Sequence, residues 1–433
     1  MKNLKLFFLM LITASFCLAS CGDDDSTGSG DVLVTAINAS GTSFEDGSAV
    51  EKDLNGAASA VDVPLDAVFK IDFDKEITAE SANDINVTIT PSGGNAVSAT
   101  VTSSGMTVTL TPTDDLQRGT LHTLNVSNVT TTDGAVLSSI NRTFTTEGRA
   151  PVVVPNIDNQ IAYWSFDGTA DDATGDYPAA NVVAITYEED RFGQGGSVAA
   201  FDGNESIIEI ADADRLIAGN SFTTSIWMKT DDTDHVNENG DPAGFFVFGL
   251  GAFLGFQLEI PSDQGFVKFA NSYVLDSGDA VAEDMFYNGE PLMAGDWQGW
   301  EFQKGIGGAD GVRDLVANKW AHIIFSYDAA EKRGTLYING ELVKAQDFDL
   351  WPDGDPKRTT AGVTYQGTEP DVEDVLAFGF VKSINSEMWA DTPWGDYAKP
   401  TANHFKGQLD DVRFFDAAFS TDDATSLYNA EKP

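Results

Sequence analysis

Short runs in which apolar and polar residues alternate recur along this chain, and they constrain its fold more than any other feature. In the first half of the chain the runs cover 67–73, 85–90, 106–111, 121–126 and 142–146. A period of two sends successive side chains to opposite faces, as in a β-strand with one face in a core and the other in solvent. Turn residues such as Gly93-Gly94 and Asp133-Gly134 separate the runs. The sequence therefore predicts an all-β protein.

The segment 32–147 resembles the bacterial Ig-like domains of surface proteins. The resemblance rests on 63–77, on 108–112 and on the closing stretch 133–146. It implies an N-terminal Ig-like β-sandwich. In that family such a domain acts as a spacer that holds another domain away from the surface. Binding of a ligand by this domain itself is the alternative.

The segment 148–159 contains Pro151 and Pro155 and is predicted to be an extended, fairly stiff linker. The remaining residues, 160–431, resemble a laminin-G-like, concanavalin A-like jelly roll. The matching pieces occur in the family's order along the chain at 162–167, 172–176, 192–195, 201–203, 222–228, 319–322, 336–340 and 407–415. The resemblance implies a second β-sandwich, with insertions at about 231–312 and 345–405 that the family pattern does not describe. Within it, Asn339-Gly340 predicts a two-residue hairpin turn, and only 421–430 has a helical pattern.

The first residues of the chain combine a short basic segment with an apolar run. Lys2 and Lys5 precede an apolar run at 6–18, which is too short to span a bilayer but has the length of a signal-peptide core. Leu18-Ala19-Ser20-Cys21 follows and resembles a bacterial lipobox, which implies that 1–20 is a cleaved signal peptide and that Cys21 carries a lipid. An ordinary signal peptide with a chance cysteine is the alternative.

Residues 21–31 contain an acidic cluster, Asp23-Asp24-Asp25, and almost no apolar side chain, so they are predicted to form a flexible tether. An acidic cluster behind a lipidated cysteine resembles the surface-export signal of Bacteroidota-type lipoproteins. The resemblance implies a location on the outer face of the outer membrane. A tether for a lipoprotein that faces the periplasm is the alternative.

The charge of the chain limits its partners. The chain has 68 acidic and 25 basic residues, and its formal net charge is −43. A field of this sign repels nucleic acid, anionic lipid and strongly anionic polysaccharide, whereas neutral glycans or ligands bridged by a cation fit better. We therefore expect no nucleic-acid partner. Solubility alone is the alternative explanation of the charge.

A calcium site is implied by the resemblance to the jelly roll. Such domains often hold a structural Ca²⁺ with acids near the first strand, the loop that follows it and the last strand. The corresponding residues are Asp167, Asp172, Asp176 and Asp410. Calcium prefers several oxygen ligands together, and in so acidic a chain solvated carboxylates are the alternative.

Aromatic residues gather in the two insertions, beside Gly, Pro, Asp and Asn. Sugar rings pack their C–H faces on aromatic planes while neighbouring polar groups bind the hydroxyls, so this pattern predicts a glycan-binding platform. Packing that pins the insertions to the sandwich is the alternative. Trp164, Trp227 and Trp320 lie in predicted strands and are assigned to the core. The candidate ligand-binding residues are Trp297, Trp300, Trp351, Trp389, Trp394 and Tyr397.

No catalytic motif is present in the sequence. The spaced acidic run of jelly-roll glucanases and the Gly-x-Ser-x-Gly motif do not occur, and four histidines show no zinc-type spacing. His322, in a predicted strand, is expected to be structural.

The order of lipid, tether, spacer and jelly roll resembles surface glycan-binding lipoproteins of polysaccharide-uptake systems. The resemblance implies capture of a poly- or oligosaccharide and transfer to an outer-membrane transporter complex. An adhesin that binds a protein or host surface is one alternative, and a polysaccharide hydrolase or lyase is another.

Overall fold

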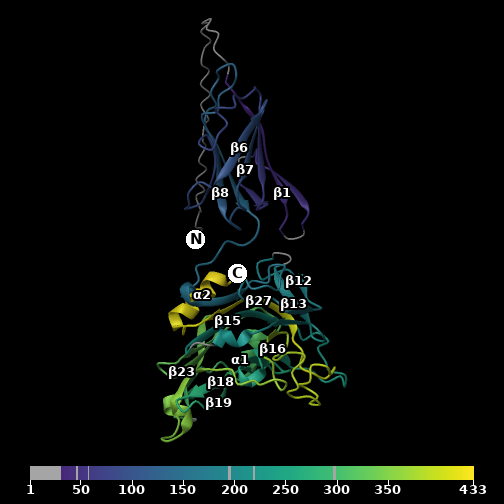
Figure 1. The fold of residues 1–433 in the computed structure, drawn as a ribbon, viewed down its shortest axis with the longest axis vertical. Coiled ribbons are helices and arrows are strands. Elements are labelled where there is room, and N and C mark those ends of the chain that lie inside the picture. Colours follow the sequence, from purple (N-terminus) through teal and green to yellow (C-terminus); the bar gives the residue numbers. More distant parts are fainter. Residues whose placement is uncertain (1–30, 45–46, 57, 194–196, 218–219, 296–298) are drawn as a thin grey trace, which may run out of the picture. The chain divides into compact units, whose positions relative to one another are not determined.

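The computed structural model describes residues 31–433 except 45–46, 57, 194–196, 218–219 and 296–298. The contacts divide the chain into two compact units, one containing Ala49–Glu147 and the strand before it, the other containing Gly148–Pro433. Both are built almost entirely of β-strands, so the predicted fold class is confirmed (Figure 1). No helix among the described residues is long and apolar enough to cross a membrane. The predicted signal peptide 1–20 and the predicted lipidation site Cys21 lie outside the described residues.

The first unit is a sandwich of two sheets, with strand orders β2-β1-β4-β7-β6 and β3-β9-β8-β5. Alternation places Phe69 and Ile71 of β4 in the core while Lys70 between them is exposed. Phe69 packs against Phe144, with ring centroids 5.1 Å apart. The strands are β1 Val34–Thr42, β2 Ala49–Asp53, β3 Ala60–Val63, β4 Val68–Phe73, β5 Val87–Pro91, β6 Ala99–Ser104, β7 Thr107–Pro112, β8 Leu121–Val126 and β9 Ile140–Thr146.

The second unit is a larger sandwich, and we call its two sheets sheet I and sheet II. Sheet I has the order β12-β13-β27-β15-β22-β23-β24-β21-β20, with β10 paired to β27. Its strands are β10 Gln160–Trp164, β12 Thr186–Glu188, β13 Val198–Asp202, β15 Phe222–Thr230, β20 Leu292–Met293, β21 Trp300–Gln303, β22 Ala321–Asp328, β23 Arg333–Ile338, β24 Glu341–Asp347 and β27 Lys406–Phe415. Asn339 and Gly340 join β23 to β24 with φ of 52° and 75°, as a two-residue hairpin turn requires, so this turn is found where it was predicted.

Sheet II has the order β11-β14-β26-β16-β17-β18-β19, with β25 paired to β18. Its strands are β11 Asn181–Val183, β14 Ile207–Ile210, β16 Phe245–Leu250, β17 Phe256–Ile260, β18 Val267–Leu275, β19 Ala280–Tyr287, β25 Thr360–Val363 and β26 Leu376–Phe378. The core between the sheets contains stacked aromatics such as Phe269 and Phe325, whose centroids are 4.5 Å apart. Most of sheet II therefore comes from segments that were expected to be insertions on the sandwich.

Two α-helices accompany the strands of the described residues, α1 Ala309–Val316 and α2 Thr421–Glu431. Helix α2 was predicted, and its N-cap is Ser420, which forms a capping box with Asp423. Helix α1 was not predicted. The 3₁₀ helices are η1 Ile157–Asn159, η2 Ala213–Ile217, η3 Ala252–Leu254, η4 Phe348–Leu350 and η5 Pro356–Thr359.

The C-terminal helix packs on the outer face of sheet I, against Ile324 of β22, Tyr337 of β23 and Phe415 of β27 (Figure 1). A cluster of buried charges lies beneath it. Arg191 forms ion pairs with Asp410 and Asp411 and donates Nε to the carbonyl of Glu431 at 2.9 Å. Arg413 donates Nε to Glu431 Oε1 at 2.8 Å. The cluster thus ties the last strand to the last helix.

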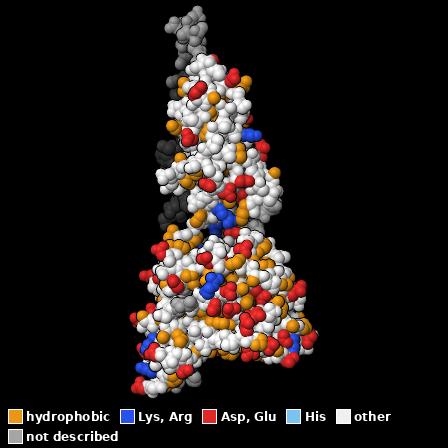
Figure 2. Space-filling model, in the orientation of Figure 1, with side chains coloured by type: hydrophobic (Ala, Val, Ile, Leu, Met, Phe, Trp, Pro, Cys, Tyr) orange, Lys and Arg blue, Asp and Glu red, His pale blue; other side chains and the backbone are white. Residues whose placement is uncertain are grey.

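The segment 148–159, predicted to be a linker, is counted with the second unit. Arg149 forms an ion pair with Asp411, and Val154 packs against the cluster of apolar residues under α2. Acidic side chains are spread over the visible face of the molecule and basic ones are few, as the composition requires (Figure 2).

Candidate binding groove

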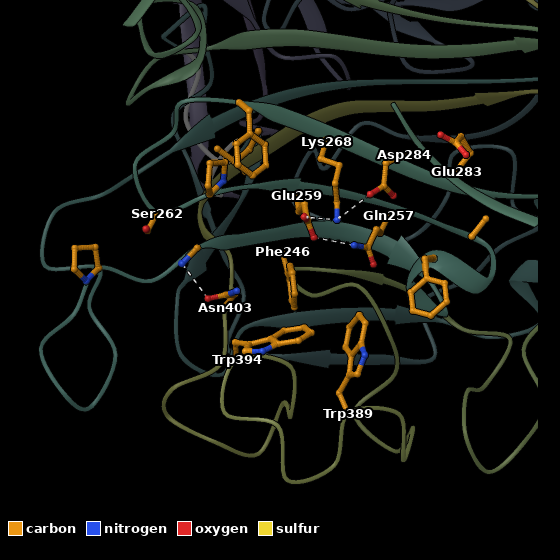
Figure 3. Close-up of a pocket in the computed structure, with 17 residues that line it drawn as sticks. Phe246, Gln257, Glu259, Ser262, Lys268, Glu283, Asp284, Trp389, Trp394 and Asn403 are labelled. Atoms are coloured by element: carbon orange, nitrogen blue, oxygen red, sulfur yellow. Dashed lines mark hydrogen bonds and ion pairs between the residues drawn. The ribbon is translucent and has the colours of Figure 1, made fainter. Parts of the chain in front are cut away.

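A groove of about 750 Å³ lies on the outer face of sheet II, the face turned away from the sandwich core. Alternation along β17 explains the position of its polar residues. Phe256 and Leu258 point into the core, so Gln257 and Glu259 point out into the groove. The segment 389–403 covers one end of the same face and supplies the opposite wall (Figure 3).

One wall of the groove is aromatic. Trp389 and Trp394 lie with ring centroids 5.0 Å apart and tilted by 56°. The ring centroid of Phe246 in β16 lies 6.1 Å from that of Trp389 and 6.2 Å from that of Trp394. The centroid of Phe253 lies 6.2 Å from that of Trp389. Trp394 is 45% exposed, so a ring face is open to a ligand. Figure 3 shows both indoles on the side of the groove opposite the charged residues.

The aromatic wall is held in a strained backbone. Trp389 has a φ of 61° and Asp391 a φ of 69°, in the left-handed region that bulky side chains avoid. A Cβ on Gly395 would lie 3.0 Å from Cβ of Trp389, so any larger residue here would require the indole to shift by a few tenths of an ångström. Backbone strain of this kind costs about 1–3 kcal/mol and clusters at functional sites.

The aromatic segment is also fastened to sheet II by hydrogen bonds. Asn403 accepts from Gly244 N at 3.0 Å through Oδ1 and from Phe246 N at 2.8 Å through its carbonyl. Its own backbone N–H donates to the carbonyl of Trp394 at 3.0 Å. These three bonds fix Trp394 relative to the strand that carries Phe246.

The other wall is polar and follows from the register of three strands. Glu259 of β17 lies directly opposite Lys268 of β18, and Lys268 Nζ is 2.7 Å from Glu259 Oε1. Asp284 of β19 lies opposite Ala270, and its Oδ2 is 3.7 Å from Lys268 Nζ. Gln257 Nε2 donates to Glu259 Oε2 at 2.8 Å. The wall therefore presents an amide, two carboxylates and an ammonium group.

Planar apolar surface facing hydrogen-bonding groups suits a ligand that has both an apolar face and polar edges. The volume lies within the ~300–1,000 Å³ of small-molecule sites. A pyranose ring has this character, since its C–H face is apolar and its hydroxyls lie around the edge.

The structure brings together two of the six candidate aromatic residues. Trp389 and Trp394 both line the groove. Tyr397 lies behind them, against Phe380, and its hydroxyl donates to the carbonyl of Glu205 at 2.6 Å. Its role is therefore to pack and position the segment, as the alternative interpretation held.

Trp300 and Trp351 do not line this groove. Lys344 Nζ lies 3.3 Å from the centroid of the Trp300 ring, and burial lowers the pKa of Lys344 to about 7. Lys357 Nζ lies 4.0 Å from the centroid of Trp351. Both indoles are thus covered by lysine side chains. Trp297 lies outside the described residues.

The polar wall was not predicted. Gln257, Glu259, Lys268 and Asp284 have no motif in common, and only the pairing of β17, β18 and β19 brings them together. Phe246 sits in a continuous apolar run, which hides the fact that it faces outward.

The four aspartates predicted to hold calcium do not form a ligand group. Among the described residues, no cluster of three or more His, Cys, Asp or Glu side chains is arranged to hold a metal ion. Asp172 accepts backbone hydrogen bonds from Tyr163 and Asp176, at 2.6 and 3.2 Å, and Asp410 is paired with Arg191. The geometry gives no support to the proposed set, which also includes Asp167, and calcium binding stays a prediction.

Of the four residues expected to be in the core or to be structural, three are buried and one is not. Trp164 and Trp227 are buried, but Trp320 precedes β22 and is only half-buried. His322 is fully buried, and its Nε2 lies 2.7 Å from Ser225 Oγ. Burial lowers the pKa of His322 to about 3, so it is neutral and its 3.7 Å approach to Glu431 is not an ion pair. His322 is therefore structural.

Comparison with known proteins identifies the first unit. Residues 52–146 match the family model of the bacterial Ig-like domain. This Ig-like domain covers all but the first strands of the unit. No curated protein matches the chain.

Solved structures to which the chain is similar include the following three domains. The binding domain of Paraclostridial Mosquitocidal Protein 1 has a TM-score of 0.40 and 13% identity, over 63% of this chain and 52% of that one. The ligand-binding domain of botulinum neurotoxin serotype D, in complex with N-acetylneuraminic acid, has a TM-score of 0.38 and 14% identity, over 63% and 51%. Domain 4 of AbnA, an arabinanase from Geobacillus stearothermophilus in complex with arabinotriose, has a TM-score of 0.35 and 19% identity, over 62% and 98%. The chain spans about half the length of the first two.

Proposed function

We propose that this protein binds a poly- or oligosaccharide in the groove on the outer face of sheet II. The observation that carries the proposal is the meeting of Trp389 and Trp394 with a polar wall across one groove. The indoles offer stacking surface to a sugar ring. Gln257, Glu259 and Asp284 offer acceptors and a donor to its hydroxyls.

We further propose that the protein acts at the cell surface. A lipid on Cys21 would anchor it in the outer membrane, and the Ig-like domain would act as a spacer for the second unit. Captured ligand would then pass to an outer-membrane transporter complex. The sequence of 1–31 and the order of the domains support this part of the proposal.

A screen of the chain without its predicted signal peptide against an array of polysaccharides tests the proposal. The screen is run with calcium and again with a chelator, and circular dichroism confirms that the protein is folded. Saturable binding to one polysaccharide class supports capture, and loss of binding on chelation supports a calcium ion at or under the site. If the folded protein binds no glycan on the array, the proposal is wrong and an adhesin becomes the favoured function.

Glycoside hydrolysis is a second candidate, because Glu259 and Asp284 place two carboxylates in the groove around one lysine. Glycosidases use a pair of carboxylates that flank the scissile bond. Incubation of the protein with the polysaccharide it binds, followed by an assay for new reducing ends, decides between capture and cleavage. Cleavage that Glu259→Gln abolishes would favour the enzyme, and intact ligand favours capture.

A further inference from the structure

The charges of the groove point to the class of sugar it accepts, and this inference rests on the proposed function. Among the described residues that line the groove, Lys268 is the only basic one, whereas Glu259, Glu283 and Asp284 are acidic. Glu283 is paired with Lys357, which does not line the groove. A ligand therefore meets a surface with an excess of carboxylates.

Lys268 cannot offset this excess for a ligand, because two carboxylates already bind it. Its Nζ lies 2.7 Å from Oε1 of Glu259 and 3.7 Å from Oδ2 of Asp284. The side chains of Lys268 and Glu259 are 22% and 18% exposed, so the pair is largely shielded from solvent. An acidic ligand would have to displace one of these partners before it could reach the ammonium group.

The arrangement is fixed by the fold. Glu259 stands directly across from Lys268 in the β17–β18 ladder, and Asp284 on β19 is its diagonal neighbour on the other side. Cross-strand neighbours of this kind are held in contact by the register and do not depend on mobile loops. Glu259 is held further by the hydrogen bond from Gln257 Nε2.

We infer that the groove selects uncharged saccharides and excludes those that carry carboxylate, sulfate or phosphate groups. Hydroxyls of a neutral sugar can donate to the outer lone pairs of Glu259 and Asp284. A uronic or sialic acid instead places a like charge beside these carboxylates, and like-charge contacts disfavour a partner. The Glu259–Lys268–Asp284 set is thus a specificity determinant.

The test uses matched pairs of oligosaccharides that differ only in one neutral sugar replaced by its uronic acid. Binding is measured by calorimetry for the wild type, for Glu259→Gln with Asp284→Asn, and for Glu331→Gln with Asp416→Asn. The second double variant removes two exposed acids outside the groove, so it is the control for net charge. Gln and Asn keep an acceptor for sugar hydroxyls, and the groove variant uncovers Lys268.

We expect the wild type and the control to bind a neutral member at least tenfold more tightly than its uronic counterpart. In the groove variant we expect the acidic member to gain about tenfold, the effect of one charge-assisted contact. Equal binding of both members by the wild type would overturn this inference and leave the proposed function standing. A gain in the control as large as in the groove variant would also overturn it, because net charge would then suffice. Failure of the wild type to bind any member would overturn both proposals.

Discussion

The substitution Trp394→Ala tests the aromatic wall with the least disturbance of the fold. Complete burial of a tryptophan removes on the order of 250 Å² of accessible surface from water. Trp394 is 45% exposed, so about 110 Å² of its surface is open to a ligand. A sugar ring stacked on one face would remove about half of this area from water. At ~25 cal/mol per Å², the lost contact corresponds to about 1.4 kcal/mol, or about tenfold in Kd.

Calorimetric titration of the wild type and the variant with the glycan found in the array screen measures this loss. Trp351→Ala is the matched control, because Trp351 lies under Lys357 and outside the groove. Both variants are first shown by thermal melting to be folded. An affinity of Trp394→Ala within twofold of the wild type would refute the reasoning, and so would an equal loss in Trp351→Ala.

Three further predictions concern the glycine of the aromatic turn and the charges under α2. Gly395→Val adds a Cβ that meets Trp389 at 3.0 Å and is expected to displace its indole. Glycan binding should therefore weaken as much as in Trp394→Ala, with no fall in the melting temperature of the second unit. Unchanged binding would show that the turn tolerates the valine. Arg191→Met leaves the buried Asp410 and Asp411 without their main partner and is expected to cost about 3–5 kcal/mol in urea unfolding at neutral pH, with a loss under about 1 kcal/mol contradicting a tight cluster. The pKa of His322 is about 3 in the folded state and about 6.5 in the unfolded state. Its contribution to the unfolding free energy is therefore complete above about pH 6.5 and decreases as the pH falls toward 3, and at pH 5 about 2 kcal/mol has been lost. His322→Gln should therefore flatten the fall in unfolding free energy between pH 6.5 and 5, and an unaltered slope would place the titration elsewhere.

The sign of the pH dependence follows from the charges around Asp410 and Asp411. Burial raises the pKa of Asp410, and the neighbouring Asp411 raises it further, so Asp410 favours the folded state as the pH falls. Burial acts on Asp411 in the same direction, but Arg191, Arg149 and Arg413 hold its pKa well below the usual range. The stability that Asp411 contributes is present above the unfolded pKa of about 3.9 and is lost as the pH falls below it. Asp411 and His322 therefore both make the second unit less stable in acid.

Alternation in the sequence predicts the strands of the first unit far better than those of sheet II. Strands such as β4 have one face in a core and one in solvent, so Phe69 and Ile71 alternate with polar residues and can be recognised. Strand β16 instead reads Phe-Phe-Val-Phe-Gly-Leu and is buried throughout, because the segment that carries Phe380 and Val381 packs on its outer side. A strand covered on both faces has no alternation, and the residues that cover it are more than a hundred positions away in the chain.

The candidate site was predictable only on its aromatic side. Trp389 and Trp394 are notable by residue type and by their Gly- and Pro-rich surroundings, so the amino-acid sequence alone marks them as candidates. Trp300 and Trp351 have similar surroundings but lie under lysines, which depends on long-range contacts that no local pattern encodes. The polar wall depends on register, since a shift of one residue in β17 would turn Gln257 and Glu259 into the core.

The second unit separates the residues that stabilise it from the residues proposed to bind. The buried charges and α2 lie on the outer face of sheet I, and the groove lies on the outer face of sheet II. The aromatic core between the sheets belongs to neither surface. Stability supplied elsewhere permits Trp389 to keep an unfavourable backbone conformation and Trp394 to remain open to solvent. Substitutions on the groove face should therefore change which sugar binds while the unit stays folded, whereas substitutions under α2 should unfold it without any selective effect on the ligand.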